Sequence, residues 1–421
     1  MNGFAFLYFL IVYGIAAFEF SLLILNYRHS KVSKASLPEA LRDAYTRELV
    51  DSSVEYTRAK GRLKILSALI EVIALSVGIF WLFPLLEGWS VSLAGSFVWQ
   101  GVIFFTLMAL GSYLLSMPFS LYSTFVLERE YGFNRTSVST YLKDTAKGLM
   151  LAVVIGLPLL LMALFAVEKV ANWWIYILAG LLVFELLSGW LFPIVILPLF
   201  SKLTPLEDGE LKQRILKLSE KAGFEIKSIF VMDASRRTSH TNAFFTGIGR
   251  AKRIVLYDSL IEKHTQEEIE AIFAHEAGHY RYKHTTKGLI LSYAVTGLSI
   301  LFLWLLTRSS VLPEIFGIER DYTALLYGGI LVSATFSAFN WLGSYISRRW
   351  EFMADEYAAK TIGSPEPMVS ALKKLAVSNL SNLSPHPLYA ALTYSHPTTR
   401  ERIENLKRIY SNNSERVEGG A

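Results

Sequence analysis

Residues 271–284 read Ala-Ile-Phe-Ala-His-Glu-Ala-Gly-His-Tyr-Arg-Tyr-Lys-His, with two histidines four positions apart and a glutamate directly after the first. A helix turns by about 400° over four residues, so His275 and His279 project from one face with Glu276 beside them. Histidine is a common zinc ligand, and a glutamate at this position is typical of the general base of zinc proteases. The stretch therefore predicts a helix that carries two metal ligands and a base.

Clear signals mark the start of this helix. Thr265 and Glu268 have the spacing of a capping box, and Glu267 and Glu270 add negative charge at the positive end of the helix dipole. A catalytic zinc keeps three protein ligands and leaves its fourth position open to water. The chain should therefore supply one further ligand, and we expect one Zn²⁺ per chain.

A candidate third ligand stands in the segment Arg-Arg-Trp-Glu-Phe-Met-Ala-Asp, where Glu351 and Asp355 are again four residues apart. Glu351 can complete the metal site, and Asp355 can accept a hydrogen bond from the outer N–H of a ligand histidine and so fix its tautomer. Taken alone, the pair is also typical of a solvated helix face, and a single HExxH pattern can arise by chance. The two patterns together favour a metal site.

The composition indicates a membrane protein, because a chain of 421 residues that is 52% hydrophobic and only 18% charged is too apolar for an ordinary soluble enzyme. The first apolar stretch has no basic segment before it and no small-residue cleavage site, so we interpret it as a retained span rather than a signal peptide. Seven stretches are long enough to cross a bilayer as helices, near residues 4–25, 65–86, 99–125, 148–168, 173–200, 287–307 and 324–346.

Lysine and arginine in the connections predict the orientation. The first and third connections are rich in both, whereas the second and fourth hold only Lys169 between them. The positive-inside rule then places the N-terminus outside and the basic connections, both metal-site segments and the C-terminus in the cytoplasm. This topology and contact with anionic membrane lipid explain the net charge of +5, so no nucleic-acid partner is expected. The chain has no cysteine, which excludes disulfides and thiolate ligands.

We expect an all-α membrane protein with seven transmembrane helices and a cytoplasmic zincin-like metalloprotease domain that contains a small β-sheet. An amphipathic helix is predicted over Glu207–Lys221 and a strand over Ser228–Met232. The expected parts are spans one to five (1–200), a soluble insert with the HExxH helix (201–284), spans six and seven (285–346), cytoplasmic helices with the third ligand (347–410) and a flexible tail (411–421).

A hairpin pattern in the insert suggests where a substrate could bind. Asn242–Phe245 and Arg253–Tyr257 both read as strands, with glycines between them. In a zinc protease, an edge strand beside the metal helix can hold an extended peptide by strand addition. Asn242, Ala243 and Phe244 are therefore candidate substrate-binding residues, although an ordinary paired strand fits the same pattern.

Several segments resemble the integral-membrane zinc endopeptidases of the CAAX prenyl protease 1 type, which cleave prenylated C-termini in eukaryotes. The resemblance runs through nearly the whole chain after residue 120. It rests on Leu127–Arg135, Pro198–Pro205, Ser239–Phe244, Lys252–Asp258, His275–His279, Glu351–Asp355 and Ser395–Pro397.

The resemblance implies a barrel of seven helices around a large water-filled chamber, with the zinc site roofing it on the cytoplasmic side. It also implies a histidine near the C-terminus that faces the site, and an arginine a few residues later. The family's positions fall on His275, His279 and Glu351 for zinc, Glu276 for catalysis, Asp355 for support, Asn242 for the edge strand, His396 and Arg402.

The reaction we expect is hydrolysis of peptide bonds in membrane-associated or lipidated peptides by zinc-activated water. Glu276 would take the proton of the water and return it to the leaving amine. His396 would donate a hydrogen bond to the tetrahedral oxyanion. The segment Ser395–Pro397 also reads as the start of a helix, so His396 could instead belong to a helix cap.

Polar residues inside the predicted spans support a wet interior. Glu19, Glu71, Glu185 and Asn340 are all costly against lipid and should point inward. They could alternatively pair with one another or with backbone groups across a dry helix bundle.

Two other functions fit parts of the sequence. The chain could be a quality-control protease for misfolded membrane proteins, or a non-enzymatic membrane protein with a structural zinc. A structural zinc would need a fourth protein ligand and would leave Glu276 without a role. The chain ends without a dilysine-type retrieval tail, which favours a prokaryotic inner membrane over the endoplasmic reticulum as its location.

Overall fold

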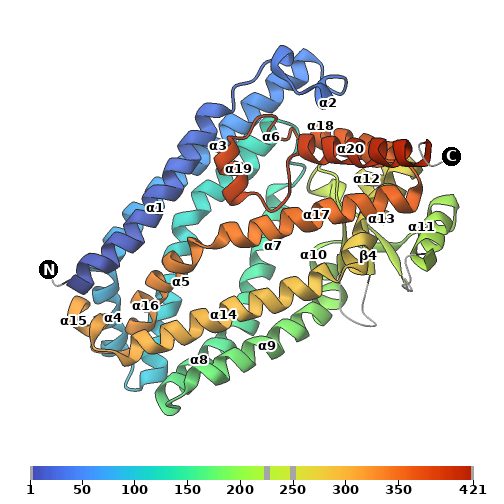
Figure 1. The fold of residues 1–421 in the computed structure, drawn as a ribbon. Helices are drawn as coiled ribbons and strands as arrows, with labels where there is room; N and C mark the ends of the chain where they lie inside the picture. Colours follow the sequence, from blue (N-terminus) through green and yellow to red (C-terminus); the bar gives the residue numbers. More distant parts are fainter. Residues whose placement is uncertain (1–2, 222–227, 247–252, 419–421) are drawn as a thin grey trace.

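The computed structural model describes residues 3–221, 228–246 and 253–418, which are mostly long helices (Figure 1). Within these ranges six helices are long and apolar enough to cross a membrane, and a pair bent by 45° supplies a seventh candidate. Each of the seven predicted stretches falls within one of them. The six are α1 (Gly3–His29), α3–α4 (Arg47–Leu93), α5–α6 (Phe97–Glu130), α7–α8 (Val138–Lys169), α9–α10 (Trp173–Phe200) and α14 (His284–Arg308), and the bent pair is α16 (Asp321–Ser337) and α17 (Asn340–Ile362).

Four of the spans contain a π-helical turn close to a proline. Such turns bend a helix because one backbone hydrogen bond of the α pattern is displaced. Gly78–Leu82 precedes α4 (Phe83–Leu93), Ser123–Leu127 precedes α6 (Glu128–Glu130), Ala152–Gly156 joins α7 (Val138–Leu151) to α8 (Leu157–Lys169), and Phe192–Ile196 joins α9 (Trp173–Leu191) to α10 (Leu197–Phe200).

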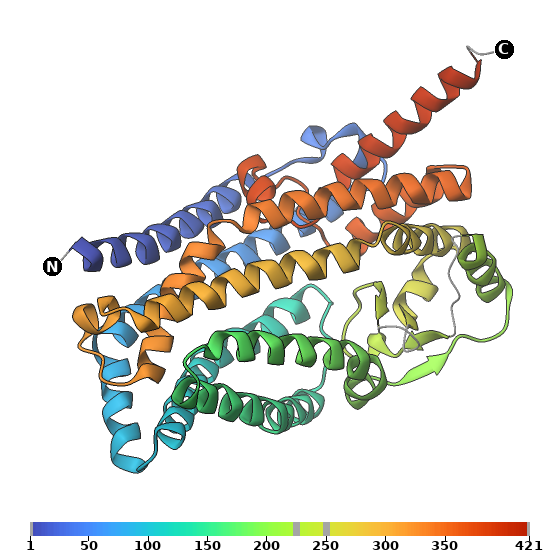
Figure 2. The ribbon, with the colours of Figure 1, turned by 60° about the horizontal axis from the view of Figure 1, so that its bottom comes forward.

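A four-stranded sheet lies at one end of the molecule, beyond the ends of the spanning helices (Figure 2). The strand order is β1-β2-β4-β3; β2 and β4 run parallel, and both outer strands are antiparallel to their neighbours. The predicted strand and hairpin are confirmed, while β1 was not predicted. The strands are β1 (Leu203–Pro205), β2 (Ile229–Met232), β3 (Ala243–Thr246) and β4 (Arg253–Tyr257).

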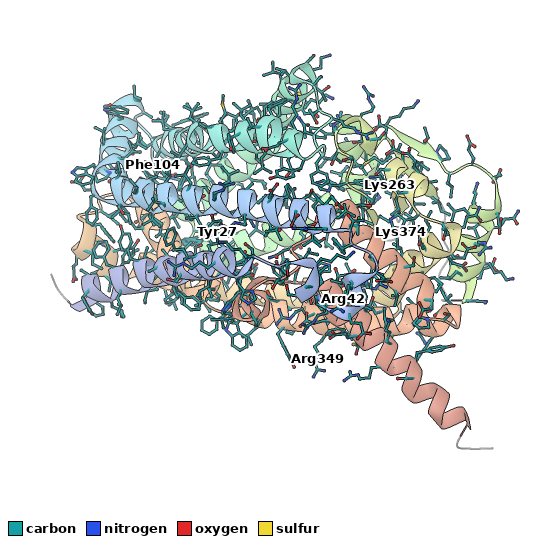
Figure 3. The ribbon with its side chains drawn as sticks, turned by 90° about the horizontal axis from the view of Figure 1, so that it is seen from above. Tyr27, Arg42, Phe104, Lys263, Arg349 and Lys374 are labelled. Atoms are coloured by element: carbon teal, nitrogen blue, oxygen red, sulfur yellow. The ribbon has the colours of Figure 1, made fainter. Side chains whose placement is uncertain are left out.

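The sheet and its helices share one apolar core. Ile254 and Leu256 of β4 are buried against Ile215 of α11 and Phe273 of α13. Figure 3 shows Lys263 and Lys374 at this end of the molecule and Phe104 toward the other. The remaining helices are α2 (Glu39–Arg42), α11 (Glu210–Lys221), α12 (Asp258–Lys263), α13 (Gln266–Arg281), α15 (Val311–Phe316), α18 (Glu366–Ser378), α19 (Pro387–Thr393) and α20 (Thr399–Glu418).

The C-terminal end differs from the expectation. Residues 411–418 are helical rather than a flexible tail, because α20 continues through Glu418, and residues 419–421 lie outside the described chain. Ile403 and Leu406 anchor the first half of α20 in a core shared with α18. The second half of α20 projects away from the molecule (Figure 2).

Candidate metal centre

Helix α13 begins at the predicted capping box. The Thr265 hydroxyl accepts from the backbone N–H of Glu268 at 3.3 Å, and the Glu268 carboxylate accepts from the backbone N–H of Thr265 at 2.9 Å. Ser370 and Lys374 of α18 donate to the same carboxylate at 2.6 and 2.9 Å. Burial raises the pKa of Glu268, but these donors outweigh it and leave the pKa below its ordinary value. The start of the helix is thereby fixed to the neighbouring helix.

The two helices of the metal site approach each other closely at a glycine. A Cβ on Gly278 of α13 would lie only 3.0 Å from Cα of Ala354 and 3.1 Å from Cβ of Tyr357 on α17. Ala277, Ala354 and neighbouring alanines are buried at this contact. Small side chains therefore let the two helices bring their functional residues within bonding range of one cation.

Three potential metal ligands converge between these helices. The carboxylate of Glu351 places Oε2 3.4 Å from Nε2 of His275 and Oε1 3.2 Å from Nε2 of His279. The two Nε2 atoms are 3.1 Å apart, and one ligand atom from each residue lies within 4.8 Å of the others. His275 and Glu351 are buried, and Glu351 Oε2 makes no hydrogen bond within the described residues. Two imidazoles and one carboxylate around a partly open space fit a catalytic zinc site.

Asp355 contacts the outer nitrogen of the His275 ring. Its Oδ1 is 2.8 Å from Nδ1 of His275, which leaves Nε2 of that ring facing the metal site. Arg402 of α20 donates to both carboxylate oxygens of Asp355, at 2.6 and 2.8 Å. Burial and Arg402 lower the pKa of His275, but its hydrogen bond to Asp355 and its close contact with the Glu351 carboxylate raise it overall to about 9.

His279 has a different outer partner, which the sequence analysis did not single out. Its Nδ1 lies 3.1 Å from Nδ1 of His284, a buried ring that stacks on Trp350 at a centroid distance of 4.9 Å. The contact depends on Lys283, whose backbone is left-handed (φ 55°) and joins α13 directly to α14. His284 is the last residue of the stretch 271–284, and its position there was the only sign in the sequence that it could reach the site. The turn that returns it to His279 leaves no sequence pattern.

Glu276 and His396 are the candidate catalytic residues next to these ligands. Glu276 follows His275 on α13 and is partly exposed, as a base that meets water must be. Nε2 of His396 is 3.3 Å from Oε1 of Glu351, and 64% of the side chain is exposed. The helix cap that Ser395–Pro397 could have formed is made instead by Thr398, whose backbone N–H donates to the Glu401 carboxylate at 2.7 Å.

Among the described residues β3 is an outer strand of the sheet, and it packs beside α13. The backbone N–H of Tyr257 donates to the carbonyl of Asn242 at 3.0 Å. Because hydrogen-bonded pairs alternate along an antiparallel ladder, the N–H of Phe244 faces β4 and the N–H of Ala243 faces outward. The Asn242 side chain accepts from that outward N–H at 2.9 Å.

A metal site of two histidines and one glutamate, with a glutamate base beside it and several membrane spans attached, defines an integral-membrane metallopeptidase. Comparison with known proteins gives the family. Residues 26–202 match the family described as CAAX prenyl protease N-terminal, five membrane helices, and residues 205–410 match peptidase family M48.

Individual relatives agree with this assignment. The chain is 34% identical to CAAX prenyl protease 1 of Saccharomyces cerevisiae, over 94% of each chain. It is 38% identical to the CAAX prenyl protease 1 homolog of Arabidopsis thaliana, over 70% of each. The crystal structure of S. mikatae Ste24p superposes with a TM-score of 0.86 at 34% identity, covering 96% of this chain and 99% of that one. The chain therefore belongs to the CAAX prenyl protease 1 family of M48 metalloendopeptidases, as the resemblance predicted.

Proposed function

We propose that this protein uses zinc to hydrolyse peptide bonds in prenylated, CAAX-type substrates at a membrane surface. The observation that carries the proposal is the convergence of His275, His279 and Glu351 on one space, with Glu276 adjoining it. The names of the relatives supply the substrate class.

The chain's own residues divide the chemical work. When bound, zinc supplies a Lewis acid that polarises the scissile carbonyl and makes water acidic enough to attack at neutral pH. Glu276 takes the proton from that water and delivers it to the leaving amine. His396 donates a hydrogen bond from Nε2 to the developing oxyanion. Asp355 and Arg402 keep the ring of His275 in the tautomer and orientation that zinc binding requires.

The spanning helices form a barrel around a water-filled chamber in this proposal. A cavity of about 800 Å³ between α1, α3 and α16 supports it, because Glu19 and Glu71 line that cavity together with Ser333 and Ser337. Glu185 on α9 and Asn340 at the bend before α17 do not line this cavity. Their exposure to water stays a prediction.

The edge strand β3 holds the substrate in an extended form. Ala243 offers an outward main-chain N–H beside the metal helix, and Asn242 is placed to exchange its own hydrogen bond for one with a peptide. Main-chain pairing would position the scissile carbonyl with little dependence on substrate side chains. Ala243→Pro should therefore lower turnover, whereas Phe244→Pro should disturb the sheet itself, since that N–H faces β4.

The metal site and the C-terminus face the cytoplasm, as the distribution of lysine and arginine predicts. Membrane lipid surrounds the spans, and no nucleic acid takes part. The relatives named above are eukaryotic, and the expected prokaryotic inner-membrane location stays a prediction.

Turnover of matched peptides tests the proposal. Purified protein should cleave a prenylated CAAX peptide faster than the same peptide without the prenyl group, and a zinc chelator should stop both reactions. Equal cleavage of unprenylated, unfolded membrane segments would favour the quality-control alternative. No cleavage with a full complement of zinc would favour the structural-zinc alternative, which needs a fourth protein ligand where the described residues offer three.

A further inference from the structure

Helix α17 presents three charged residues along one face toward the segment that carries His396. Glu351 contacts His396 itself, and Asp355 binds Arg402 at the start of α20. Arg348, one turn before Glu351, donates from Nη1 to the carbonyl oxygen of Tyr394 at 2.6 Å and toward that of Ala390 at 3.5 Å. The contacts with Tyr394 and Arg402 lie on opposite sides of His396 in the sequence.

His396 has few contacts of its own to hold it in place. Apart from Glu351, its ring meets the Ser395 hydroxyl at 3.0 Å from Nδ1, and most of its surface is exposed. The position of the ring is therefore set by the backbone of the segment between α19 and α20. After His396 that backbone is fixed by buried Pro397 and by the cap at Thr398.

Before His396, the bond from Arg348 is one of the anchors, together with the hydrogen bond from the backbone N–H of Tyr394 to the carbonyl of Ala390 and the contact between the Tyr394 and Tyr389 rings. A cavity of about 360 Å³ adjoins this part of the segment, with Tyr394, His396 and Arg348 among its lining residues. Packing against that side of the segment is therefore incomplete, so the hydrogen bond from Arg348 contributes more to holding the backbone in place. A guanidinium donor to carbonyls at the C-terminal end of α19 is a charge-assisted bond that the helix dipole also favours.

We propose that Arg348 is a positioning residue, which holds the backbone of Tyr394 so that Nε2 of His396 stays at the metal site. The inference rests on the oxyanion role proposed for His396. It makes α17 a common template, since this helix carries the candidate ligand Glu351 and also Arg348 and Asp355, which bind the chain before and after His396. Within the described residues Arg348 donates to the carbonyls of Tyr394 and Ala390 and makes no hydrogen bond to the candidate metal ligands.

Replacement of Arg348 by methionine tests the proposal, with the neighbouring Arg349→Met as the matched control. Arg349 is exposed at the periphery (Figure 3) and donates a hydrogen bond to the hydroxyl of Tyr345. Arg348→Met should lower kcat about 10- to 100-fold, as expected for a misplaced catalytic group, with KM and zinc content within about twofold of the parent. Arg349→Met should stay within about twofold in all three quantities. Arg348→Lys keeps one charged donor and should recover part of kcat; it also serves if the methionine variant does not fold.

A double-variant cycle separates positioning from a general structural effect. If Arg348 acts through His396, then Arg348→Met combined with His396→Ala should lose no more kcat than His396→Ala alone. Multiplicative losses, or an unchanged kcat in Arg348→Met, would overturn the inference while leaving the role of His396 intact. Full activity of His396→Ala would overturn the proposed oxyanion role and the inference together.

Discussion

Helices α13 and α17 touch along small residues, whereas α1, α3 and α16, although they also contact one another, leave a cavity of about 800 Å³ between them. At the first contact Gly278 faces Ala354 with no room for a methyl group. At the second, carboxylates and serines line open space. The chain therefore meets two different requirements in two different regions. The chemistry needs atoms held to within a fraction of an ångström, and substrate access needs volume and water.

The largest expected effect comes from the carboxylate in the tightly packed region. Glu276→Gln should lower kcat about 10²- to 10⁴-fold, because it removes a general base, and should leave about one zinc per chain, because Glu276 is not a ligand. His275→Ala, His279→Ala or Glu351→Ala should instead lose the metal. Zinc content by elemental analysis, measured beside turnover, distinguishes the two classes. Glu276→Gln with full activity would exclude the mechanism.

Adding one methyl group in each of the two regions tests this contrast directly. Gly278→Ala should destabilise the protein by about 1–3 kcal/mol and reduce zinc content, because the new Cβ meets the backbone of α17. Gly329→Ala in α16 should be neutral or stabilising by up to about 1 kcal/mol, since nothing lies within 4 Å of a Cβ there and alanine favours helix. Unfolding in detergent measures both. Equal effects of the two substitutions would remove the contrast.

Zinc affinity should depend on pH through His275. Its pKa of about 9 without metal lies above the ordinary value of 6.5, so near pH 7 the ring carries a proton that zinc must displace. The apparent affinity should therefore fall about tenfold for each unit of pH below 9, for this one proton. Competition with a chromophoric chelator between pH 6.5 and 8.5 measures the slope. A flat profile would mean that the contacts of His275 with the carboxylates of Asp355 and Glu351 do not raise this pKa.

The smallest effect is a difference in labelling rate between neighbouring positions on α1. Glu19 lines the cavity, whereas Phe18 is exposed and does not line it, and the two side chains diverge by about 100°. The chain has no native cysteine, so single variants Glu19→Cys and Phe18→Cys report cleanly. A membrane-impermeant thiol reagent should label Glu19→Cys several-fold faster. Equal rates would indicate that the cavity holds no water.

The residues whose grouping could be predicted from the sequence belong to short local patterns. Helical intervals separate the members of each pair, His275 with His279 and Glu351 with Asp355. Strand β3 pairs with β4, whose strand pattern is also visible in the sequence. Contacts between segments far apart in the sequence were harder to predict. Arg402 was assigned to the site only through the family resemblance, and its pairing with Asp355 was not predicted.

Other features depend on the tertiary fold and had no sequence signal. The contact of His284 with His279 requires a left-handed residue that is not glycine. Strand β1 is only three residues long, too short for a periodic pattern. The polar composition of residues 411–418 predicts disorder. In the structure these residues continue α20, a helix that begins in a packed region.

The abrupt join at Lys283 brings the candidate metal site close to a candidate membrane span. Since α14 starts at His284, His279 stands within about two helical turns of the first residue of that helix. An extended peptide advances about 3.3 Å per residue, so under the proposed function we expect only a few residues between a substrate's lipid anchor and the bond that meets Glu276. Lengthening the join by whole residues should therefore shift the preferred cleavage position along the substrate.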